Sequence, residues 1–591
     1  MTNGPTPENP PSEPRLPYGY YLLNFLAVLA EVEARDGDLL IPEERDALAR
    51  FRACSLPAQR LYVRMLTRKG PWFRRDGLQY AEIGDPDSPI VELLQAGFCE
   101  GQATLDDLLP LLRRQDLLEI LGTCGIAFLK GQRREELLLA LLQGIAEPEL
   151  LTLLRTLLRP VRPLLGELWR RIFLMFYGNF EQDLSSFVIA DTGHIHYETY
   201  AIDSGTRSFD TRGDVDYMLS LHGLREWLGA VASGPELAEL TQATLAMGAH
   251  PGLRQQRRFQ GLLNDLGRAW ERAEQAEKAM NCYALSERPP ARERQVRILA
   301  AQGNLEAACQ LAMTLADPPK DVGEARFARS FLQRQRKKVG FVEPWLLAQS
   351  PLEPIPAIHM TAPRHPSGSV EMAALECACS EGWEGFFTEN TLWRALFGLA
   401  FWEELFAAVP GAFQHRFQNA PLDLRSGSFY ANRQQLIEER LAWLANSKGL
   451  PAHLLEIADR KWGVANAFLN WRRLNRTHLY EALRRIEPNV AVGVLSIMVQ
   501  NPTAFDSGFP DLFLFRPESD AWKLWEVKGP GDTLRPEQEW WLKHFNRLGC
   551  SAEVAWIRLG GELHPGPSRA GEWGLIGPAL HSQGTFPEGG N

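Results

Sequence analysis

Three charged residues stand where an apolar core is expected, in the stretch GFPDLFLFRPESDAWKLWEVKGPGD. The runs Leu512–Phe515 and Ala521–Val527 are apolar and aromatic, as is typical of buried β-strands. Asp511 opens the first run, whereas Glu526 and Lys528 lie within and just after the second. Because charged side chains are rarely buried without partners, these three residues are the first candidates for chemistry.

A hairpin would bring the two acids face to face. Residues 517–520 (PESD) form a polar turn between the runs, which predicts a four-residue loop with Arg516 paired to Ala521. In that register Asp511 lies directly opposite Glu526. Opposed residues have Cβ atoms roughly 4.5–5.5 Å apart, and like charges there are destabilising. The pair therefore needs a compensating positive charge.

A divalent cation meets this need, because hard Mg²⁺ or Mn²⁺ ions prefer carboxylate oxygen. Lys528 is two residues beyond Glu526 and so shares its face of the strand. There its ammonium group can orient or deprotonate an attacking water, or stabilise charge on an attacked phosphate. The simpler alternative is an ordinary hairpin whose charged residues face solvent.

The flanking sequence predicts the elements that would hold these residues. Aromatic residues such as Phe513 and Trp525 place the hairpin in a central sheet. The segment RPEQEWWLKHFNRLG then predicts an amphipathic helix, with Pro536 in its first turn and Gly549 past its end. A further apolar strand, AEVAWIRL, follows. Hairpin, helix and strand in this order are typical of a PD-(D/E)xK nuclease core, an α/β fold with a mixed sheet.

Longer motifs extend the likeness. GFPDL, WEVKGPGD and EQEWWL closely resemble the VRR-NUC nuclease domain, and the chain as a whole resembles the Fanconi-associated nuclease family. The segment AQRLYVRMLTRKGPWFRRDGLQYAEI resembles the N-terminal region of that family, and further matches lie in 388–406 and 447–474. The likeness covers most of the chain from Leu16 to Leu559.

The resemblance implies a third acid, supplied by an upstream helix. The matching residue is Glu389, followed by Asn390 where the family usually has glycine. Glu381 and Glu384 are rivals for this role. A purely structural alternative is that Thr388 caps the helix and Glu389 sits in its first turn, where a carboxylate is favourable.

The resemblance also implies what the site does. The main-chain carbonyl of Val527 is expected to join Glu389, Asp511 and Glu526 in holding one or two Mg²⁺ or Mn²⁺ ions, while Lys528 assists the attacking water. The implied activity is 5′-flap endonuclease with 5′-to-3′ exonuclease action on branched DNA, in the repair of interstrand crosslinks. Two alternatives are a Holliday-junction resolvase-like enzyme and a catalytically silent DNA-binding repair scaffold.

Local basic patches are the candidate DNA-binding surfaces, because the chain is acidic overall, with a net charge of −10. Arg50–Arg75 and Arg326–Lys338 contain no Asp or Glu. Such a run is often only a solvated face, but two runs with interleaved aromatic residues favour phosphate contacts. The residues expected to contact DNA are Arg64, Arg68, Lys69, Arg74, Arg75, Lys130, Arg133 and Arg134.

The predicted fold class is a multi-domain chain, mostly α-helical, ending in an α/β restriction-endonuclease-like core. Helices flanking Gly125–Gly131 resemble a SAP module, and Leu266–Gly267, Trp270, Ala279, Tyr283 and Pro290 are spaced as in a tetratricopeptide unit, with a looser copy at Gly303, Ala307 and Pro318. Such a solenoid offers a surface for protein partners. The expected domains are a disordered tail (1–16), a basic DNA-binding region (17–90), the SAP-like module (91–148), the tetratricopeptide-like helical region (149–350), a Pro-rich linker (351–370), the VRR-NUC nuclease domain (371–560) and a loop-rich tail (561–591).

Several classes of function are disfavoured. No apolar run approaches the ~20 residues that span a bilayer, and the N-terminus lacks the pattern of a secretion signal. Scattered cysteines indicate a reducing compartment, and the lack of a Cys-pair zinc finger favours a bacterial, cytoplasmic form. No Gly-rich nucleotide-binding loop is present. His194 and His196 form a weak metal candidate without a third ligand, and Gln538 either supports the site or faces solvent.

Overall fold

The computed structural model describes residues 18–129, 131–191, 195–231, 233–316, 322–339, 354–425, 428–446 and 449–560. These residues form two compact units. The first holds the described residues up to Ile195, with Ala201–Gly223 and Phe413–Phe417; the second holds His196–Tyr200, Leu224–Ala412 and the described residues from Gln418 onward. Of the helices in these ranges, none is both long and apolar enough to cross a membrane.

The first unit is helical and is built around a cluster of aromatic rings. Phe25, Phe51, Tyr62, Phe98 and Trp169 pack with ring centroids 5.1–5.9 Å apart. This core holds the basic segment rigidly, because helix α3 belongs to it. The elements around it are α1 (Tyr20–Asp36), η1 (Gly37–Leu39), α2 (Pro42–Ala53), α3 (Leu56–Leu66), η2 (Arg75–Gly77), α4 (Asp87–Gln95), β1 (Cys99–Glu100), β2 (Arg162–Pro163), α9 (Gly166–Tyr177) and α10 (Ser185–Asp191).

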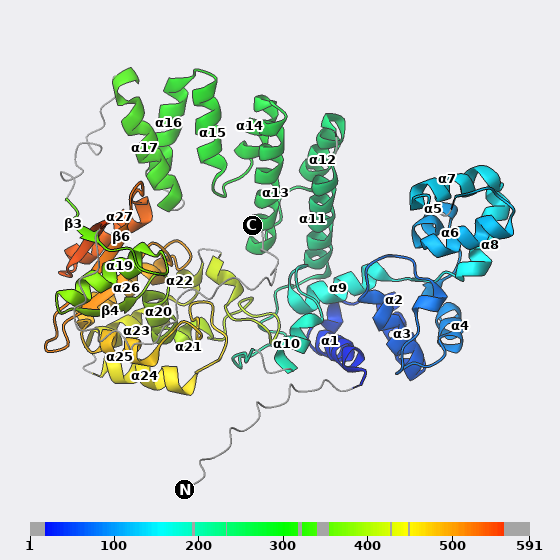
Figure 1. Cartoon of the computed structure of the whole chain (residues 1–591), viewed down its shortest axis with the longest axis horizontal. Helices are drawn as coiled ribbons and strands as arrows, with labels where there is room; N and C mark the ends of the chain where they lie inside the picture. Colours follow the sequence, from blue (N-terminus) through cyan, green and yellow to red (C-terminus); the bar gives the residue numbers. More distant parts are fainter. Residues whose placement is uncertain are drawn as a thin grey trace, which may run out of the picture. The chain divides into compact units, whose positions relative to one another are not determined.

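A leucine-rich helical module lies within this unit (Figure 1, α5 to α8). Leu108, Leu117, Leu121, Leu137 and Leu154 are fully buried in its core. The two helices that flank the turn near Gly125 form as predicted, as α6 and α7. The elements are α5 (Leu105–Leu108), η3 (Leu109–Leu111), α6 (Arg114–Thr123), α7 (Arg134–Gly144) and α8 (Glu147–Leu158).

The central part of the chain forms consecutive antiparallel helices that stand side by side (Figure 1, α12 to α17). Trp270, Ala279 and Tyr283 are buried between them, as the repeat spacing predicts. Gly267 is required by close packing, because a Cβ there would lie 2.6 Å from the Tyr283 ring. Pro318, part of the looser repeat, lies outside the described residues. The helices are α11 (Arg212–Ala230), α12 (Gly234–Met247), α13 (Leu253–Arg272), α14 (Ala276–Ala284), α15 (Ala291–Ala301), α16 (Leu305–Ala316) and α17 (Val322–Val339).

A five-stranded mixed sheet follows, in the order β3-β7-β6-β5-β4. Strand β7 is parallel to β3 and β6, whereas β5 is antiparallel to β4 and β6. The strands are β3 (Ala357–Ala362), β4 (Glu384–Phe387), β5 (Leu512–Phe515), β6 (Trp522–Lys528) and β7 (Ala552–Leu559). Strand β3 lies within the segment expected to be a Pro-rich linker, so the sheet begins before the predicted domain boundary.

Small residues let helix α19 approach one face of the sheet closely. Ala373, Ala374 and Ala378 pack against a face that includes Leu514 and Trp525. The mostly helical chain with a terminal α/β core confirms the predicted fold class. The remaining elements are α19 (Val370–Ser380), α20 (Leu392–Ala400), α21 (Trp402–Leu405), η4 (Leu422–Arg425), α22 (Phe429–Asn432), α23 (Gln434–Asn446), α24 (Leu450–Arg460), α25 (Arg476–Leu483), α26 (Pro488–Gln500) and α27 (Pro536–Arg547).

Candidate active site

The predicted hairpin register is present. Leu512 pairs with Trp525, so the preceding Asp511 comes opposite Glu526. At the other end of the hairpin, the Arg516 N–H donates to the Ala521 carbonyl at 2.9 Å. Asp511 and Glu526 are 8% and 0% exposed, so both carboxyl groups lie inside the protein. The hairpin therefore buries the two acids against each other and not toward solvent.

Asp511 is fixed from several directions. Its Oδ2 accepts a hydrogen bond from the Val527 N–H at 2.8 Å. Its own carbonyl accepts from the Thr388 N–H at 2.8 Å, and the Thr388 hydroxyl donates to Pro510 O at 2.7 Å. The preceding Phe509 ring packs on Trp541, with centroids 4.4 Å apart. These contacts hold Asp511 and its neighbours in place at the start of β5.

Glu526 is a buried carboxylate with few compensating contacts. Lys528 Nζ lies 2.8 Å from Glu526 Oε1, which forms an ion pair. Even so, neither Glu526 oxygen accepts a hydrogen bond of regular geometry from the described residues. Burial and then the charge of Asp511 raise the pKa of Glu526, against the opposing effect of Lys528. One ammonium group thus faces two acids.

The pKa of Asp511 is also raised. Burial is the largest cause, opposed by the hydrogen bond from Val527. The charge of Glu389 raises this pKa further, and Glu389 has the same effect on Glu526. Electrostatically, Glu389 therefore belongs to the site.

The local structure of Glu389 differs from our expectation. Glu389 lies in an exposed turn between β4 and α20, and not in the first turn of a helix. Thr388 does not cap α20, since its hydroxyl is bound to Pro510. The reason is Asn390, whose φ of 51° is left-handed and breaks the chain away from helical geometry. Glycine and asparagine tolerate this conformation best, which fits the glycine usual at this position in the family.

The two rival acids lie at the wrong end of the strand pair. Glu384 pairs with Phe515, whereas Phe387 pairs with Leu512, next to Asp511. Glu381 precedes β4, and its carbonyl accepts from Arg516 at 2.7 Å. The register therefore favours Glu389 as the third acid.

Sequence reasoning missed one acid near the site. Glu371 lies in the first turn of α19, where its Oε2 accepts from the Ser369 hydroxyl at 2.6 Å. Its charge contributes to the raised pKa of Asp511. Ser369 also caps this helix through the Met372 N–H, and a serine before an apolar run could have located the helix start.

The donor set fits a hard divalent cation in part. Glu526 contributes a buried carboxylate whose one charged neighbour of opposite sign is Lys528 among the described residues, and Asp511 faces it across the hairpin. Within the described ranges, no three acidic, histidine or cysteine side chains converge tightly enough to form a complete cation site. Glu389, the predicted third acid, lies in an exposed turn outside this buried pair. The role of the Val527 carbonyl stays a prediction.

The predicted DNA-binding residues of the first unit are more engaged with the protein than their sequence indicates. Arg64 pairs with Glu82 at 2.7 Å. Arg68 donates to the Gly77 carbonyl at 3.0 Å and to the Tyr80 hydroxyl at 2.8 Å, although it remains exposed. These contacts assign Arg64 chiefly to structure.

Lys69 is exposed, and the described residues offer it no ion pair. Arg74, by contrast, pairs with Asp76 at 2.9 Å and with Asp116 from α6. Its guanidinium links the basic segment to the leucine-rich module. Of these two cations, Lys69 is the one available to DNA.

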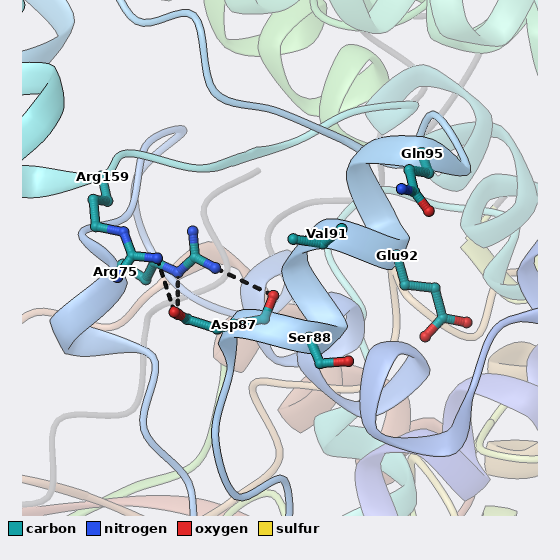
Figure 2. Close-up of a pocket in the computed structure, with 7 residues that line it drawn as sticks. All are labelled: Arg75, Asp87, Ser88, Val91, Glu92, Gln95 and Arg159. Carbon is teal, nitrogen blue, oxygen red and sulfur yellow. Dashed lines mark hydrogen bonds and ion pairs between the residues drawn. The ribbon is translucent and has the colours of Figure 1, made fainter.

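Arg75 lines an open pocket in the first unit (Figure 2). Its guanidinium and that of Arg159 converge on the Asp87 carboxylate, with Arg159 Nη2 2.8 Å from Oδ2. The two guanidinium groups lower the pKa of Asp87. Ser88, Val91, Glu92 and Gln95 complete the lining. The charges in this pocket are therefore largely satisfied within the protein.

Of the remaining candidate residues, some are bound within the protein and others are exposed or lie outside the described residues. Arg134 donates to the Leu109 and Leu112 carbonyls, so it holds two turns together. Arg133 is exposed. Lys130 and His194 lie outside the described residues. Gln538 caps α27, since its Oε1 accepts from the Arg535 N–H at 2.9 Å.

Comparison with known proteins shows which family this chain resembles. Residues 19–100 match the family model described as "FAN1, HTH domain", and residues 447–557 match the VRR-NUC domain. A Fanconi-associated nuclease 1 homolog of Pseudomonas aeruginosa is 33% identical, with 94% of this chain and 98% of the relative covered. The human Fanconi-associated nuclease 1 is 25% identical over 91% of this chain and 62% of its own length.

A solved structure is also similar to this chain. The crystal structure of paFAN1 bound to 2nt 5′flap DNA with gap superposes with a TM-score of 0.79 at 29% identity, covering 93% of this chain and all of that one. Its fold, the two matching domain models and the relative at 33% identity agree. The chain belongs to the Fanconi-associated nuclease family.

Proposed function

We propose that this protein hydrolyses phosphodiester bonds of branched DNA near 5′ flaps, at the site formed by Asp511, Glu526 and Lys528. The observation that carries the proposal is the pair of buried, opposed carboxyl groups with one lysine on the same strand face. Trimming in the 5′-to-3′ direction and repair of interstrand crosslinks are part of the proposal, because they follow from the family.

The chain's own residues account for most of the chemistry. Asp511 and Glu526, in their ionised forms, would hold a Mg²⁺ or Mn²⁺ ion together with Glu389 from the turn after β4. The ion, when bound, polarises the phosphate and makes a water molecule more acidic. Lys528, released from its contact with Glu526, donates a hydrogen bond to the charged phosphate or orients the water.

The preference for flaps rests on similarity. Two solved structures of paFAN1 are described as bound to 5′flap DNA with a gap, with flaps of 1nt and 2nt. Contacts to phosphate groups position DNA without reading its sequence. The expected selectivity is therefore for branch structure and not for base sequence.

Cleavage assays on flap, nicked and four-way DNA test the proposal. Asp511→Ala and Glu526→Ala are expected to reduce flap cleavage by about 100-fold or more, because each removes a charge-stabilising group. DNA affinity should stay near that of the wild type. Glu384→Gln is a matched control, since Glu384 lies at the far end of the strand pair.

The same assay separates the alternatives. Symmetric cutting of four-way DNA would indicate a junction resolvase, and the absence of cleavage by the wild type with either ion would indicate a silent scaffold. Parental rates in the Asp511→Ala variant would overturn the site assignment.

A further inference from the structure

A second basic and aromatic segment lies in the unit that holds the active site. Residues 460–476, RKWGVANAFLNWRRLNR, contain two tryptophans and several cations but no Asp or Glu. The segment follows α24 and ends in the first residue of α25. Interleaved aromatic and basic residues without acids are typical of surfaces that bind single-stranded nucleic acid.

The tryptophans form a row of tilted ring contacts, the tryptophan row, that ends at the surface. Trp462 is 45% exposed, and its ring centroid lies 4.9 Å from that of Trp471. The ring centroid of Trp471 lies 6.5 Å from that of Trp402, and Trp471 donates its Nε1–H to the Val464 carbonyl at 2.7 Å. Trp471 is thus held in place, and it supports Trp462 from behind. The outer ring presents an apolar surface to solvent at a defined position.

Some of the cations near the tryptophan row have acidic partners, and others do not. Lys461 and Arg476 have acidic partners, Glu198 and Asp459, each at 2.5 Å. In contrast, Arg472 and Arg473 are exposed, and no acidic side chain of the described residues forms an ion pair with either. The segment that carries the exposed ring therefore also carries positive charge without acidic partners, which favours an anionic ligand over an apolar one.

The segment is fixed relative to the active-site turn. Arg394, in α20, donates to the Ala467 carbonyl at 2.7 Å, and the Phe397 and Phe468 rings lie 4.5 Å apart. Helix α20 starts just after Glu389 and leads to Trp402. Its nine residues span about 13 Å. The end of α20 that leads to the tryptophan row is therefore about 13 Å from the end that follows Glu389.

We propose that Trp462 stacks on an unpaired base of a DNA single strand, while Arg472 and Arg473 contact its phosphate groups. This proposal rests on the proposed function, because it assigns a binding surface to the unpaired part of the same branched substrate. Base stacking on an aromatic ring tolerates any sequence. The surface would thus recognise a single strand as such.

A second exposed tryptophan in the same unit provides a control. Trp443 is 41% exposed on α23 and packs against His453 at 4.6 Å. Its helix carries Glu438 and Glu439, and the nearby Arg440 is paired with Glu404 at 2.8 Å. Trp443 therefore matches Trp462 in exposure, but the residues named here leave no unpaired positive charge beside it.

Fluorescence anisotropy without divalent metal tests the proposal. A labelled oligothymidine and a blunt duplex are titrated with wild type, Trp462→Ala, Trp462→Phe and Trp443→Ala. Trp462→Ala is expected to weaken single-strand binding by about tenfold, the equivalent of one stacked base, and to leave duplex binding unchanged. Trp462→Phe should retain most of the affinity, and Trp443→Ala all of it.

A double variant extends the test. Arg472→Gln with Arg473→Gln should weaken single-strand binding and reduce its salt dependence. Unchanged single-strand affinity in Trp462→Ala, equal losses for both DNAs, or an equal loss in Trp443→Ala would each overturn the proposal. Thermal melting confirms that the variants are folded. Flap cleavage by the wild type is measured separately, so a failure of the proposed function shows there and not in the binding series.

Discussion

Glu526 and Asp511 are costly to ionise in the folded protein, because each carries a carboxyl group into its interior. Both pKa values are raised, mainly by burial. Between the ordinary carboxyl pKa of about 4 and these raised values, the folded protein holds more protons than the unfolded chain does. The free energy of unfolding therefore falls as pH rises across this interval.

This balance predicts a pH-dependent effect of metal on stability. The melting temperature of the metal-free protein should fall as pH rises, and Mg²⁺ or Mn²⁺ should raise it more at high than at low pH, because the ion replaces protons. Both effects should shrink in the Asp511→Asn, Glu526→Gln double variant. Thermal melting with EDTA or metal measures this directly. Identical pH slopes in wild type and double variant would contradict it.

At the scale of single residues, the sequence predicted contacts that form within one hairpin. The turn length and the alternation of a strand were enough to place Asp511 opposite Glu526. The ion pair between Lys528 and Glu526 follows from the same alternation. The capping role of Gln538 was missed, because a polar residue three positions after a helix start has two possible functions.

The turn from Thr388 to Thr391 is the element that decides the third acid. It follows β4 beside Asp511, and Asn390 bends it through a left-handed conformation. The family resemblance implied a helix here, and the purely structural alternative had Thr388 as its cap. The apolar run that begins at Leu392 hid the extra turn, because its periodicity fixes a helix axis but not its first residue.

Glu389 and Glu384 can be compared directly. Glu389→Gln is expected to weaken Mn²⁺ binding and to lower flap cleavage by at least about tenfold, because it removes one carboxylate near the ion. Glu384→Gln, on the same short segment, should match the wild type in both. Isothermal titration of Mn²⁺ and a cleavage assay give the two readouts. Loss of metal binding in Glu384→Gln alone would reverse the assignment.

Strand β3 lies where the sequence pattern predicted a linker. Its sequence AIHMTA lies between prolines, which predicted a linker. In the sheet it pairs only with β7, at the edge, where neighbouring prolines are tolerated. Edge position is a tertiary property that the local pattern does not contain.

For the whole molecule, segregated charge in the sequence did not reveal how many of these cations pair with acids in the folded protein. The run from Arg50 to Arg75 lacks acids, yet Arg64, Arg74 and Arg75 pair with acids from elsewhere in the chain. Asp116, for example, is 42 residues from Arg74. Such pairs depend on folding and leave no trace in a short window of sequence.

Within the basic segment Arg50–Arg75, we therefore expect substitutions of exposed cations and of paired cations to have different effects. Lys69→Gln with Arg68→Gln should weaken binding to all DNA sequences similarly and lower its salt dependence, with little change in melting temperature. Arg74→Gln with Arg75→Gln should lower the melting temperature, because the mostly buried Asp116 loses the guanidinium group that pairs with it. DNA titrations at several salt concentrations and thermal melting measure both. An unchanged salt slope in the first variant would remove Lys69 from the interface.

The proposed hydrolysis depends on a divalent ion held between the opposed carboxylates of Asp511 and Glu526. Anomalous diffraction from crystals soaked with Mn²⁺ tests this most directly. We expect a peak bonded to both Asp511 and Glu526 in the wild type, and its loss in the Glu526→Gln variant. A wild-type protein that cuts flap DNA with Mn²⁺ yet shows no peak between these two side chains would contradict the account.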